Sequence, residues 1–537
     1  MHKYLLRVFI AMAAVCAIFF PAGRVRSVGA APVDELHLAV SESPHSLDPL
    51  LSSTTDEQTL ALLAFDTLLT VTREGGLAPS LATVVPTLRN GGISRDGKRV
   101  IFHLRRNVTW HDGKPFTSAD VAFTIHAILD PATPIADRSG YDDIASVETP
   151  NAETVVFHLK AVYSPFVTIV GNQFPIVPEH LLEKSKKISE DPFGAAPIGT
   201  GPYRFVRQSR GDKIEYVANE SYWGGAPKIK RVNVAEIPEG TTQALEVRQG
   251  LLDYVSLSSN EFAQLRENPS LVAAITPIND FVAYALNTAR PTLANVEVRR
   301  AISMAIDREA LVRDDTFGTG TVAYADLPLF LWTQRQPRAP YGYDPAAANA
   351  LLDRVGWHRG PGGVRVRDGK RLHLVMIDFS GSVTGRNLDT QIQQMLAAVG
   401  IEIELKYFSL SLYYSPVAEG GPVAKGDFDL AAYDFSSGPD PFDDEIFGCS
   451  HREPNGFNAA RYCAPAMERL QRASLTELDP VVRRRDVTKI ENLAATDLPY
   501  IFLYHTPLRV IHSKRLSHSA AAIGSVNYRI GDWSFAR

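Results

Sequence analysis

The sequence contains little cysteine and has no excess of basic charge. Only three of its 537 residues are cysteines, at positions 16, 449 and 463. So few cysteines exclude a small disulfide-built scaffold, and together with the single neighbouring His451 they do not complete a zinc site. The 55 basic and 60 acidic residues give a net charge of -5, which argues against a nucleic-acid-binding surface. A short basic run at 483–485 lies in a helical pattern, and we expect it to form a solvated helix face.

Long hydrophobic runs are absent after the first thirty residues. The chain begins with the basic stretch MHKYLLR, continues with thirteen apolar residues, VFIAMAAVCAIFF, and reaches VGA before Ala31. This order predicts a signal peptide over residues 1–30, because the apolar stretch is too short for a membrane span. Cys16 follows Val15 instead of a small residue, so we expect no lipid anchor. The mature protein is therefore expected to be soluble and periplasmic or extracellular.

Length and periodicity predict an α/β protein with more than one lobe. The chain is longer than the roughly 250–300 residues at which a single hydrophobic core stops growing. Alternating residues predict strands at 100–110 and 154–160, and apolar residues at helical spacing predict one helix over 295–312. The segment DTQIQQMLAAVGIEIELKYF predicts a helix, a glycine turn and a strand in direct succession.

The two cysteines of the mature chain are expected to form a disulfide. Cys449 and Cys463 enclose a short segment with Pro454, Asn455 and Gly456, which favour a turn. An exported protein encounters an oxidising compartment, where such a pair is stable.

The segment TWHDGKPFTSADV, residues 109–121, contains residue types that could be catalytic, but its pattern indicates a structural role. HDGK predicts a turn, and Thr117 with Asp120 three residues later predicts a capping box before a helix. We therefore expect local structural roles for His111, Asp112 and Asp120.

Motifs of enzymes are missing from the sequence. It contains no G-x-S-x-G elbow, no H-E-x-x-H helix and no S-x-x-K. The acidic segment DPFDDE, residues 440–445, lacks the spacing of an EF-hand loop and is expected to start a helix. We expect a protein that is not an enzyme and has no cofactor and no metal site, with a secreted hydrolase as the rival interpretation.

The order of several segments resembles a known family. From about residue 36 to about 515 the chain is similar to the extracellular solute-binding proteins of family 5, the peptide- and nickel-uptake type that serves ABC importers. The resemblance is carried by SPHSLDPLLSS, LLAFDTLLTV, PIGTGPYRFV, YWGGAPKIKRV, NTARPTLANVEVRRAISMAIDREALV, YDPAAANALLDRVGW and DFDLAAYDFSSGPDPF.

The resemblance implies a two-lobed α/β clamp of the periplasmic-binding-protein type II, with an extra scaffold subdomain in lobe I. Lobe I would comprise residues 31–282, including the scaffold at about 50–195, and the return segment 504–537; lobe II would comprise 283–503. The crossovers would lie at YALNT (284–288) and YIFLYHTPL (500–508). A ligand would be enclosed by hinge closure.

The implied function is capture of a peptide or related small solute for a membrane permease. Ser437 and Gly438 stand where peptide binders place an Asp for the ligand's ammonium, and Arg386 is the nearest candidate for the ligand's carboxylate. A free dipeptide is therefore disfavoured relative to a longer peptide or to a non-peptide solute such as an oligosaccharide, a metal chelate or an opine.

Between the lobes, a set of cleft and crossover residues is expected to contact the solute. These residues are Asn287, Phe435, Ser436, Ser437, Asp440, Tyr504 and His505. His505 could equally be a hinge residue whose hydrogen bonds are satisfied internally. We expect replacement of Asp440 or Tyr504 to weaken binding with little loss of stability. The expected partners are the solute and the ABC permease subunits, with no nucleic acid, and the protein is expected to be a monomer.

Overall fold

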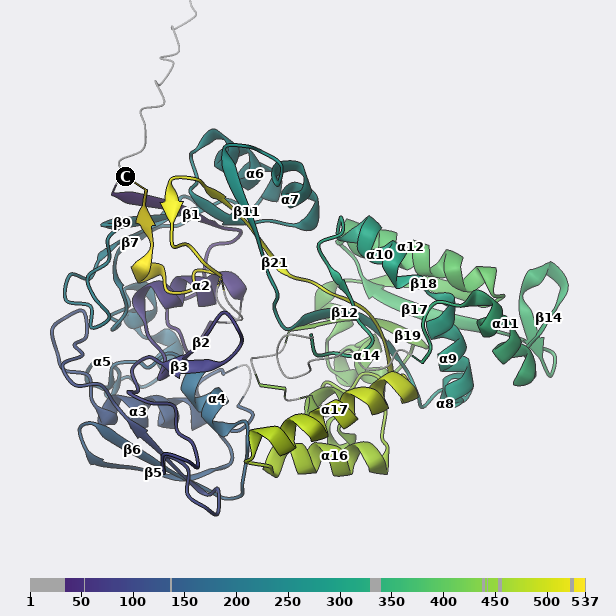
Figure 1. Ribbon diagram of the computed structural model, residues 1–537, viewed down its shortest axis with the longest axis horizontal. Coiled ribbons are helices and arrows are strands. Elements are labelled where there is room, and N and C mark those ends of the chain that lie inside the picture. Colours follow the sequence, from purple (N-terminus) through teal and green to yellow (C-terminus); the bar gives the residue numbers. More distant parts are fainter. Residues whose placement is uncertain are drawn as a thin grey trace, which may run out of the picture.

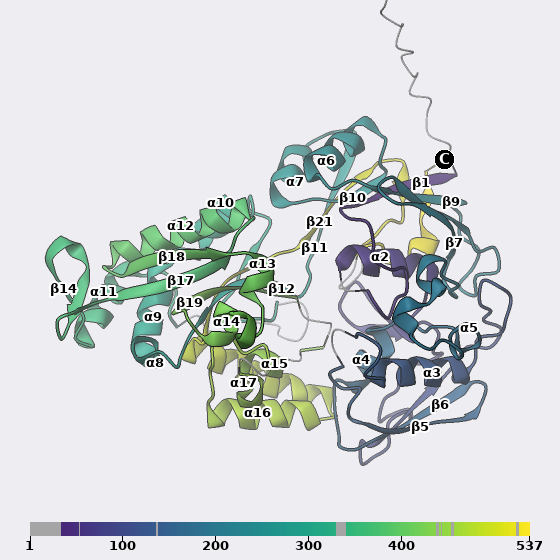
Figure 2. The ribbon, with the colours of Figure 1, turned by 180° about the vertical axis from the view of Figure 1, so that it is seen from behind.

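The computed structural model describes residues 34–52, 54–135, 138–328, 340–436, 440–441, 443–452, 456–521 and 526–536. Within these residues the chain forms two bodies, each built on its own large sheet, which stand side by side in Figures 1 and 2. The first body carries the C-terminal end of the chain, and long strands run from it into the second. The fold is the two-lobed α/β clamp that the sequence predicts.

Lobe I contains a seven-stranded sheet to which both ends of the described chain contribute. Its strand order is β11-β21-β10-β1-β9-β8-β7. These strands are β1 (Glu35–Val40), β7 (Tyr203–Ser209), β8 (Lys213–Ala218), β9 (Arg231–Glu236), β10 (Tyr254–Ser256), β11 (Leu271–Thr276) and β21 (Leu508–Ser513). Strand β1 runs parallel to β9 and β10, and β21 returns antiparallel between β10 and β11. Helices α6 (Gly240–Gln249) and α7 (Ser259–Leu265) pack beside β21 over a small apolar core of their own.

A scaffold subdomain is inserted between β1 and β7. It comprises α2 (Thr55–Ala64), β2 (Leu69–Val71), β3 (Leu77–Pro79), β4 (Arg99–His103), α3 (Ser118–Leu129), β5 (Ile144–Asn151), β6 (Thr154–Leu159), α4 (Phe166–Asn172), α5 (Glu179–Leu182) and the short η1 (Ile188–Glu190) and η2 (Pro192–Ala195). Strands β4, β6 and β5 form an antiparallel sheet, and β2 pairs with β3. Its side chains share one core with the large sheet, in which Phe102 and Phe157 pack edge to face and Trp533 of the C-terminal segment is fully buried. The scaffold and the large sheet are therefore one folding body.

Lobe II is built on a mixed six-stranded sheet of order β13-β20-β12-β19-β17-β18. These strands are β12 (Asp280–Leu286), β13 (Thr321–Val322), β17 (His373–Phe379), β18 (Glu402–Phe408), β19 (Leu430–Ser436) and β20 (Tyr500–His505). Along β12, Tyr284 and Leu286 enter one apolar core while Ala283 and Ala285 enter another. Because successive side chains of a strand point to opposite faces, both faces of this sheet are covered.

Helices cover both faces of the lobe II sheet. They are α8 (Pro291–Ala294), α9 (Val296–Ala305), α10 (Arg308–Asp315), α11 (Pro345–Arg354), α12 (Val383–Ala398), α13 (Leu410–Tyr413), α14 (Pro422–Lys425), α15 (Asp444–Phe447), α16 (Pro465–Thr476) and α17 (Pro480–Asp497), with η3 (Pro361–Gly363), η4 (Val417–Glu419) and η5 (Cys449–His451). The helix predicted over 295–312 is two helices, because Asp307 leaves the helical conformation and caps α10 through the amide of Ala310 at 3.0 Å. The predicted succession of α12, Gly400 at φ 86° and β18 is confirmed.

Two short segments connect the sheets. The chain leaves β11 at Thr276 and enters β12 at Asp280, and it returns from β20, ending at His505, to β21, starting at Leu508. The first connection therefore precedes residues 284–288, which lie within and directly after β12. The second connection falls inside the predicted segment 500–508.

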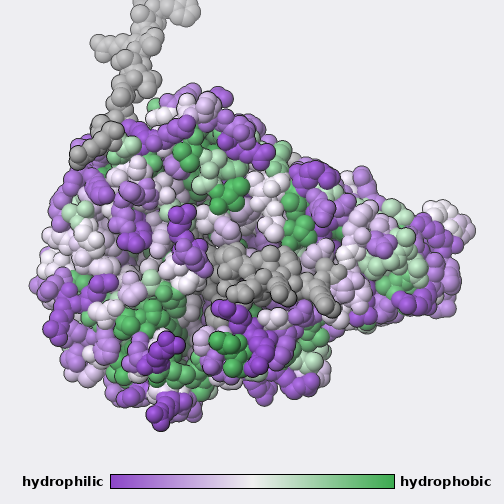
Figure 3. Space-filling view, in the orientation of Figure 1, coloured by the Kyte–Doolittle hydropathy of each residue, from purple (hydrophilic) through white to green (hydrophobic). Residues whose placement is uncertain are grey.

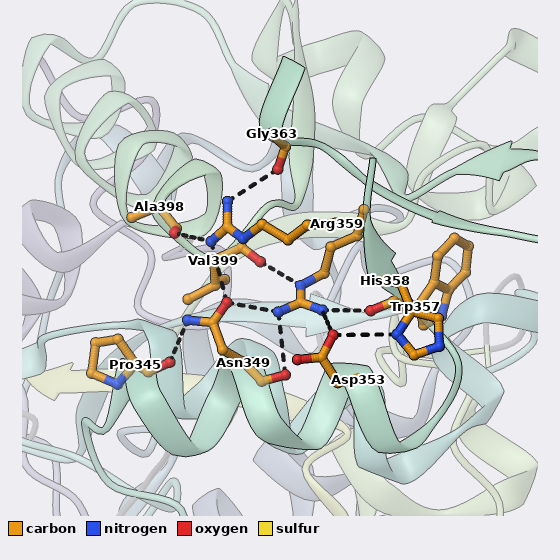
Figure 4. A network of polar contacts seen from close by, with 10 residues as sticks. Pro345, Asn349, Asp353, Trp357, His358, Arg359, Gly363, Ala398 and Val399 are labelled. Carbon is orange, nitrogen blue, oxygen red and sulfur yellow. Dashed lines mark hydrogen bonds and ion pairs between the residues drawn. The ribbon is translucent and has the colours of Figure 1, made fainter. Parts of the chain in front are cut away.

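Small sheets complete the fold. Strands β22 (Leu516–Ser517) and β23 (Ser534–Phe535) pair near the C-terminal end, next to η6 (Ile530–Asp532), and β14 (His358–Arg359), β15 (Arg365–Arg367) and β16 (Lys370–Arg371) project from the far end of lobe II. Arg365 is 1% exposed and donates to the carbonyl of Val399 (2.7 Å) and to the side chain of Asn349 (2.7 Å). Arg359 of the same small sheet donates to the carbonyl of Ala398 at 2.6 Å, as Figure 4 shows. Two arginines thus tie the projecting sheet to α11 and α12.

The surface of the face shown in Figure 3 is mainly hydrophilic, with separate hydrophobic patches. Within the described residues, the search for a helix long and apolar enough to cross a bilayer finds none.

The predicted disulfide is confirmed: Cys449 and Cys463 are bonded, with their Cα atoms 4.8 Å apart. We expect thiol titration of the denatured, unreduced mature protein to find neither cysteine free, and to find two thiols after reduction. Two reactive thiols before reduction would contradict the bond.

Candidate ligand-binding site

A pocket of about 850 Å³ lies on lobe I and is closed on one side by lobe II. Its wall comes mainly from the scaffold subdomain and the C-terminal segment. Within the described part of lobe II, Asp440 and Glu445 line it. Ser139 of the scaffold donates a hydrogen bond to Glu445 at 3.1 Å. The hydroxyl of Ser164 donates to the carbonyl of Glu477 at 2.5 Å, after the end of α16. The two lobes therefore touch on the side away from their connecting strands.

Asp66 holds the aromatic part of the lobe I wall in place. Its carboxylate accepts hydrogen bonds from the Tyr222 hydroxyl (2.9 Å), the Trp223 indole (2.8 Å) and the Thr200 hydroxyl (3.0 Å). Burial raises the pKa of Asp66, and these hydrogen bonds and nearby Arg105 oppose that rise. Because both oxygens are occupied, Asp66 positions the wall and does not offer a free charge to a solute.

Among the described residues two arginines line the pocket, Arg105 and Arg529, and Arg529 is paired with Asp532 at 2.7 Å. The Nε of Arg105 donates to the carbonyl of Ser80 at 2.5 Å, and its guanidinium carbon lies 4.4 Å above the ring of Trp223. Within the described residues its terminal amino groups form no hydrogen bond, and the residue lines the pocket. A planar guanidinium fixed in this way suits a carboxylate or another planar anion.

Asp440 lines the pocket but is already neutralised by Arg483 of α17. The guanidinium donates to both carboxylate oxygens, at 2.7 and 2.5 Å, and also to the carbonyl of Ser474. Both residues are buried, so Arg483 is not part of the solvated face expected for residues 483–485, whereas Arg484 and Arg485 are exposed. We also revise the expectation that replacing Asp440 leaves stability unchanged, because its loss would strand a buried cation.

The predicted crossover residues are buried in lobe II. Asn287 donates to the carbonyls of Gly426 (3.1 Å) and Phe428 (3.2 Å) and accepts from the amide of Ala289 (3.2 Å). Tyr504 is 3% exposed and packs in the core of lobe II, so its replacement is also expected to cost stability. Contact of Asn287 and Tyr504 with a solute stays a prediction.

His505 lies at the second connection between the lobes. Its Nδ1 is 3.3 Å from the carbonyl oxygen of Asp280, and burial lowers the pKa of His505 to about 4. The ring is therefore neutral at physiological pH. This contact agrees with the interpretation that His505 is a hinge residue whose hydrogen bonds are made within the protein. A role of His505 in solute binding stays a prediction.

The cleft segment after β19 is only partly described. Phe435 and Ser436 end that strand and pair with Phe281 and Asp280 of β12 in the ladder. Ser437 lies outside the described residues. Arg386, the weak candidate for a carboxylate partner, is exposed on α12 and does not line the pocket.

In the segment 109–121, Asp112, Thr117 and Asp120 make the predicted local contacts, whereas His111 contacts Gly199 and Gly201, 88 and 90 positions away. His111 accepts from the amide of Gly199 at Nδ1 (3.2 Å) and contacts the carbonyl of Gly201 at Nε2 (3.0 Å), and burial lowers its pKa to about 4. Asp112 accepts from the amide of Lys114 at 3.1 Å. The capping box of Thr117 and Asp120 is present at the start of α3.

We expect Asp120→Ala to lower the free energy of unfolding by about 1–2 kcal/mol. Its carboxylate accepts hydrogen bonds from the amides of Thr117 (2.8 Å) and Glu179 (3.0 Å). The substitution removes both hydrogen bonds, one at the start of α3 and one at the start of α5. Urea unfolding measures the loss, and calorimetry should find solute affinity unchanged. Abolished binding by a folded Asp120→Ala protein would show that the segment 109–121 takes part in solute binding.

The lobe I wall was not predicted residue by residue. Asp66 lies in LLAFDTLLTV, Arg105 in the strand segment at 100–110, and Trp223 in YWGGAPKIKRV. The resemblance names these segments but not their meeting point, because Asp66 and Trp223 are 157 positions apart in sequence. Arg105 lies inside the strand predicted over 100–110, whereas β4 ends at His103, so no local signal marked it as a pocket residue.

Comparisons with known proteins agree with this architecture. Residues 76–456 match the family model described as bacterial extracellular solute-binding proteins, family 5 middle. The chain is 31% identical over 501 residues to Protein XP55 of Streptomyces lividans, covering 93% of this chain and 88% of that protein. Its fold is similar to the oligopeptide-binding protein AppA of Bacillus subtilis in complex with a nonapeptide (TM-score 0.76, 23% identity, 94% and 99% of the two chains). It is also similar to NikA of Brucella suis in complex with Fe(III)-EDTA (TM-score 0.81, 22% identity, 94% and 100%). The chain therefore belongs to the bacterial extracellular solute-binding proteins of family 5.

Proposed function

We propose that this protein captures a peptide or a related small solute between its two lobes and delivers it to the permease of an ABC importer. The observation that carries the proposal is the pocket of about 850 Å³ on lobe I, to which Asp440 and Glu445 of lobe II also contribute. A volume of this size is typical of small-molecule sites, and hinge closure would bury the solute. Relatives named as ABC transporter peptide-binding proteins in Brucella and a nickel-binding periplasmic protein in Escherichia coli support the transport role.

The charges of the pocket favour a solute with an accessible anionic group. Arg105 offers a guanidinium to the pocket. Of the acidic lining residues, Asp440 is bound to Arg483, Asp532 is paired with Arg529, and Glu445 accepts from Ser139. A free dipeptide would bring a buried ammonium without an evident partner, which costs several kcal/mol. The proposal is therefore a longer peptide, held mainly through its backbone, or a carboxylate-bearing chelate.

The proposed setting is outside the cytoplasmic membrane. A signal peptide over residues 1–30 would export the chain, and the permease subunits and a monomeric state follow as parts of the same proposal. The proposed lobe boundaries are 31–282 with 504–537, and 283–503.

Mass spectrometry of small molecules released by denaturing the natively purified protein tests the solute class. A set of peptides supports peptide uptake, and a metal with an organic acid supports a chelate. A neutral sugar would contradict the anionic class, and hydrolysis of the bound solute by the purified protein would favour the hydrolase interpretation.

Calorimetry with the identified solute then tests the role of Arg105. We expect Arg105→Ala to weaken binding at least tenfold, which is about 1.4 kcal/mol. Arg106→Ala is the matched control, since its side chain is exposed and does not line the pocket. Equal affinities for the two variants would remove Arg105 from the site.

A further inference from the structure

Three acidic side chains meet in the interior of lobe II, away from the pocket wall. Asp326 follows β13, Asp443 directly precedes α15, and Glu491 lies on α17. They are 3%, 4% and 1% exposed, and one carboxylate oxygen from each lies within 4.8 Å of those of the other two. A cluster of like charges this close and this deep requires neutralisation.

The oxygens of these carboxylates are poorly satisfied by the protein. Five of them are inaccessible to solvent and have no hydrogen-bond partner: Oδ1 of Asp326, both oxygens of Asp443 and both of Glu491. In the described part of the chain, none of the three forms an ion pair with Lys, Arg or His. Buried polar groups of native proteins nearly always have partners, so orphaned oxygens that converge indicate an absent one.

The local structure shows that Asp443 is turned toward this cluster. It occupies the N-cap position of α15, yet its side chain makes no capping hydrogen bond. Burial and the nearby carboxylate of Asp326 raise the pKa of Asp443, and the buried amide of Gln471 on α16 opposes that rise. The neighbouring Asp444 points elsewhere, with its Oδ2 3.2 Å from Nε2 of His451.

We propose that Asp326, Asp443 and Glu491 bind a hard divalent cation of the calcium class inside lobe II. Oxygen-only ligands select Ca²⁺, Mg²⁺ or Mn²⁺ over zinc or copper. Oxygens that bind one Ca²⁺ stand at most about 4.8 Å apart, and the three ligand atoms lie within that distance of one another. The two charges of the cation would leave one net negative charge on three carboxylates.

This cation would hold the pocket wall of lobe II. Asp443 lies between Asp440 and Glu445, which are the lining residues of lobe II among those described. Glu491 shares α17 with Arg483, the partner of Asp440. The site would tie the segment after β13, the start of α15 and helix α17 to one point. The inference does not depend on the nature of the solute.

The test uses the purified protein stripped with EDTA and titrated with Ca²⁺, Mg²⁺ and Mn²⁺ separately, by calorimetry and by thermal unfolding. We expect one equivalent of Ca²⁺ to bind and, at saturation, to raise the melting temperature by about 5 °C. Glu491→Gln and, independently, Asp326→Asn should raise the dissociation constant for Ca²⁺ at least tenfold. Asp444→Asn is the control that should keep the response, since it removes a carboxylate from the same segment without touching the cluster.

The alternative is that the carboxyl groups share protons, because Asp326 and Glu491 lie close enough for one to donate to the other when protonated. In that case EDTA and all three cations leave the wild-type melting temperature unchanged, and that result overturns the proposal without any variant. A response to Ca²⁺ that persists in both Glu491→Gln and Asp326→Asn overturns it as well, because the cation would then bind elsewhere.

Discussion

Replacing Arg483 by methionine is expected to lower the free energy of unfolding by about 3–5 kcal/mol. The guanidinium forms two hydrogen bonds to Asp440, at 2.7 and 2.5 Å, and both side chains are at most 6% exposed. Methionine keeps much of the packing volume and removes the charge, so Asp440 is left as an uncompensated buried carboxylate. The loss is measured by urea unfolding.

Arg485→Met serves as the control, because Arg485 lies on the same helix and is exposed. Its effect should stay within about 0.5 kcal/mol. The double variant Asp440→Asn, Arg483→Met should recover part of the stability, since it removes both charges together. Equal stability of Arg483→Met and Arg485→Met would show that the ion pair does not form.

Raising the pH from 5 to 8 is expected to destabilise the wild-type protein by about 3 kcal/mol relative to Asp280→Asn. Burial and the nearby carboxylate of Asp434 raise the pKa of Asp280 to about 8. The residue lies where the first connection enters β12, and the Thr506 hydroxyl of the second connection donates to it at 2.6 Å.

The sign follows from proton binding. Between about pH 4, the pKa of an unfolded aspartate, and pH 8, the folded protein holds a proton that the unfolded chain releases. This stabilisation is complete below pH 4 and is lost as the pH rises through 8, at up to about 1.4 kcal/mol per pH unit. We expect a loss of about 3 kcal/mol in the free energy of unfolding between pH 5 and pH 8. This is less than the full value, because Asp434 is exposed and solvent weakens its interaction with Asp280.

Asp280→Asn carries a permanent donor in place of that proton, so the difference between the two proteins isolates the pair. His505 has a lowered pKa of about 4, and its opposing contribution below pH 6.5 cancels because both proteins contain it. Parallel pH profiles for the two proteins would show that Asp280 is ionised in the folded state.

Several helices and strands were predictable because their signals are local, whereas the two-lobed arrangement was implied by the family resemblance. The capping box at Thr117, the glycine that ends α12 and the alternation of β4 depend on neighbouring residues only. Apolar spacing alone predicted one helix where the structure has α9 and α10. The spacing continues through Ile306, but Asp307 caps a new helix. A single residue decided that boundary.

The site was predictable only in part, because its contacts join distant segments. The partner of Asp440 is 43 positions away, and Arg483 looked like surface because two exposed arginines follow it. Asp443 belonged to an acidic segment that lacks EF-hand spacing, and its neighbours Asp326 and Glu491 come from other elements. Sequence spacing identifies sites built from one loop and misses sites assembled by tertiary packing.

The central claim is that the two lobes close on a solute, and small-angle X-ray scattering tests it most directly. In this structure the lobes touch at Ser139 with Glu445 and at Ser164 with Glu477, on the side away from the connecting strands. Scattering from protein saturated with its co-purified solute should match this arrangement. Protein freed of solute by denaturation and refolding should give a larger radius of gyration that falls again when the solute is added. Solute binding proven by calorimetry with the same radius of gyration in both samples would contradict the clamp.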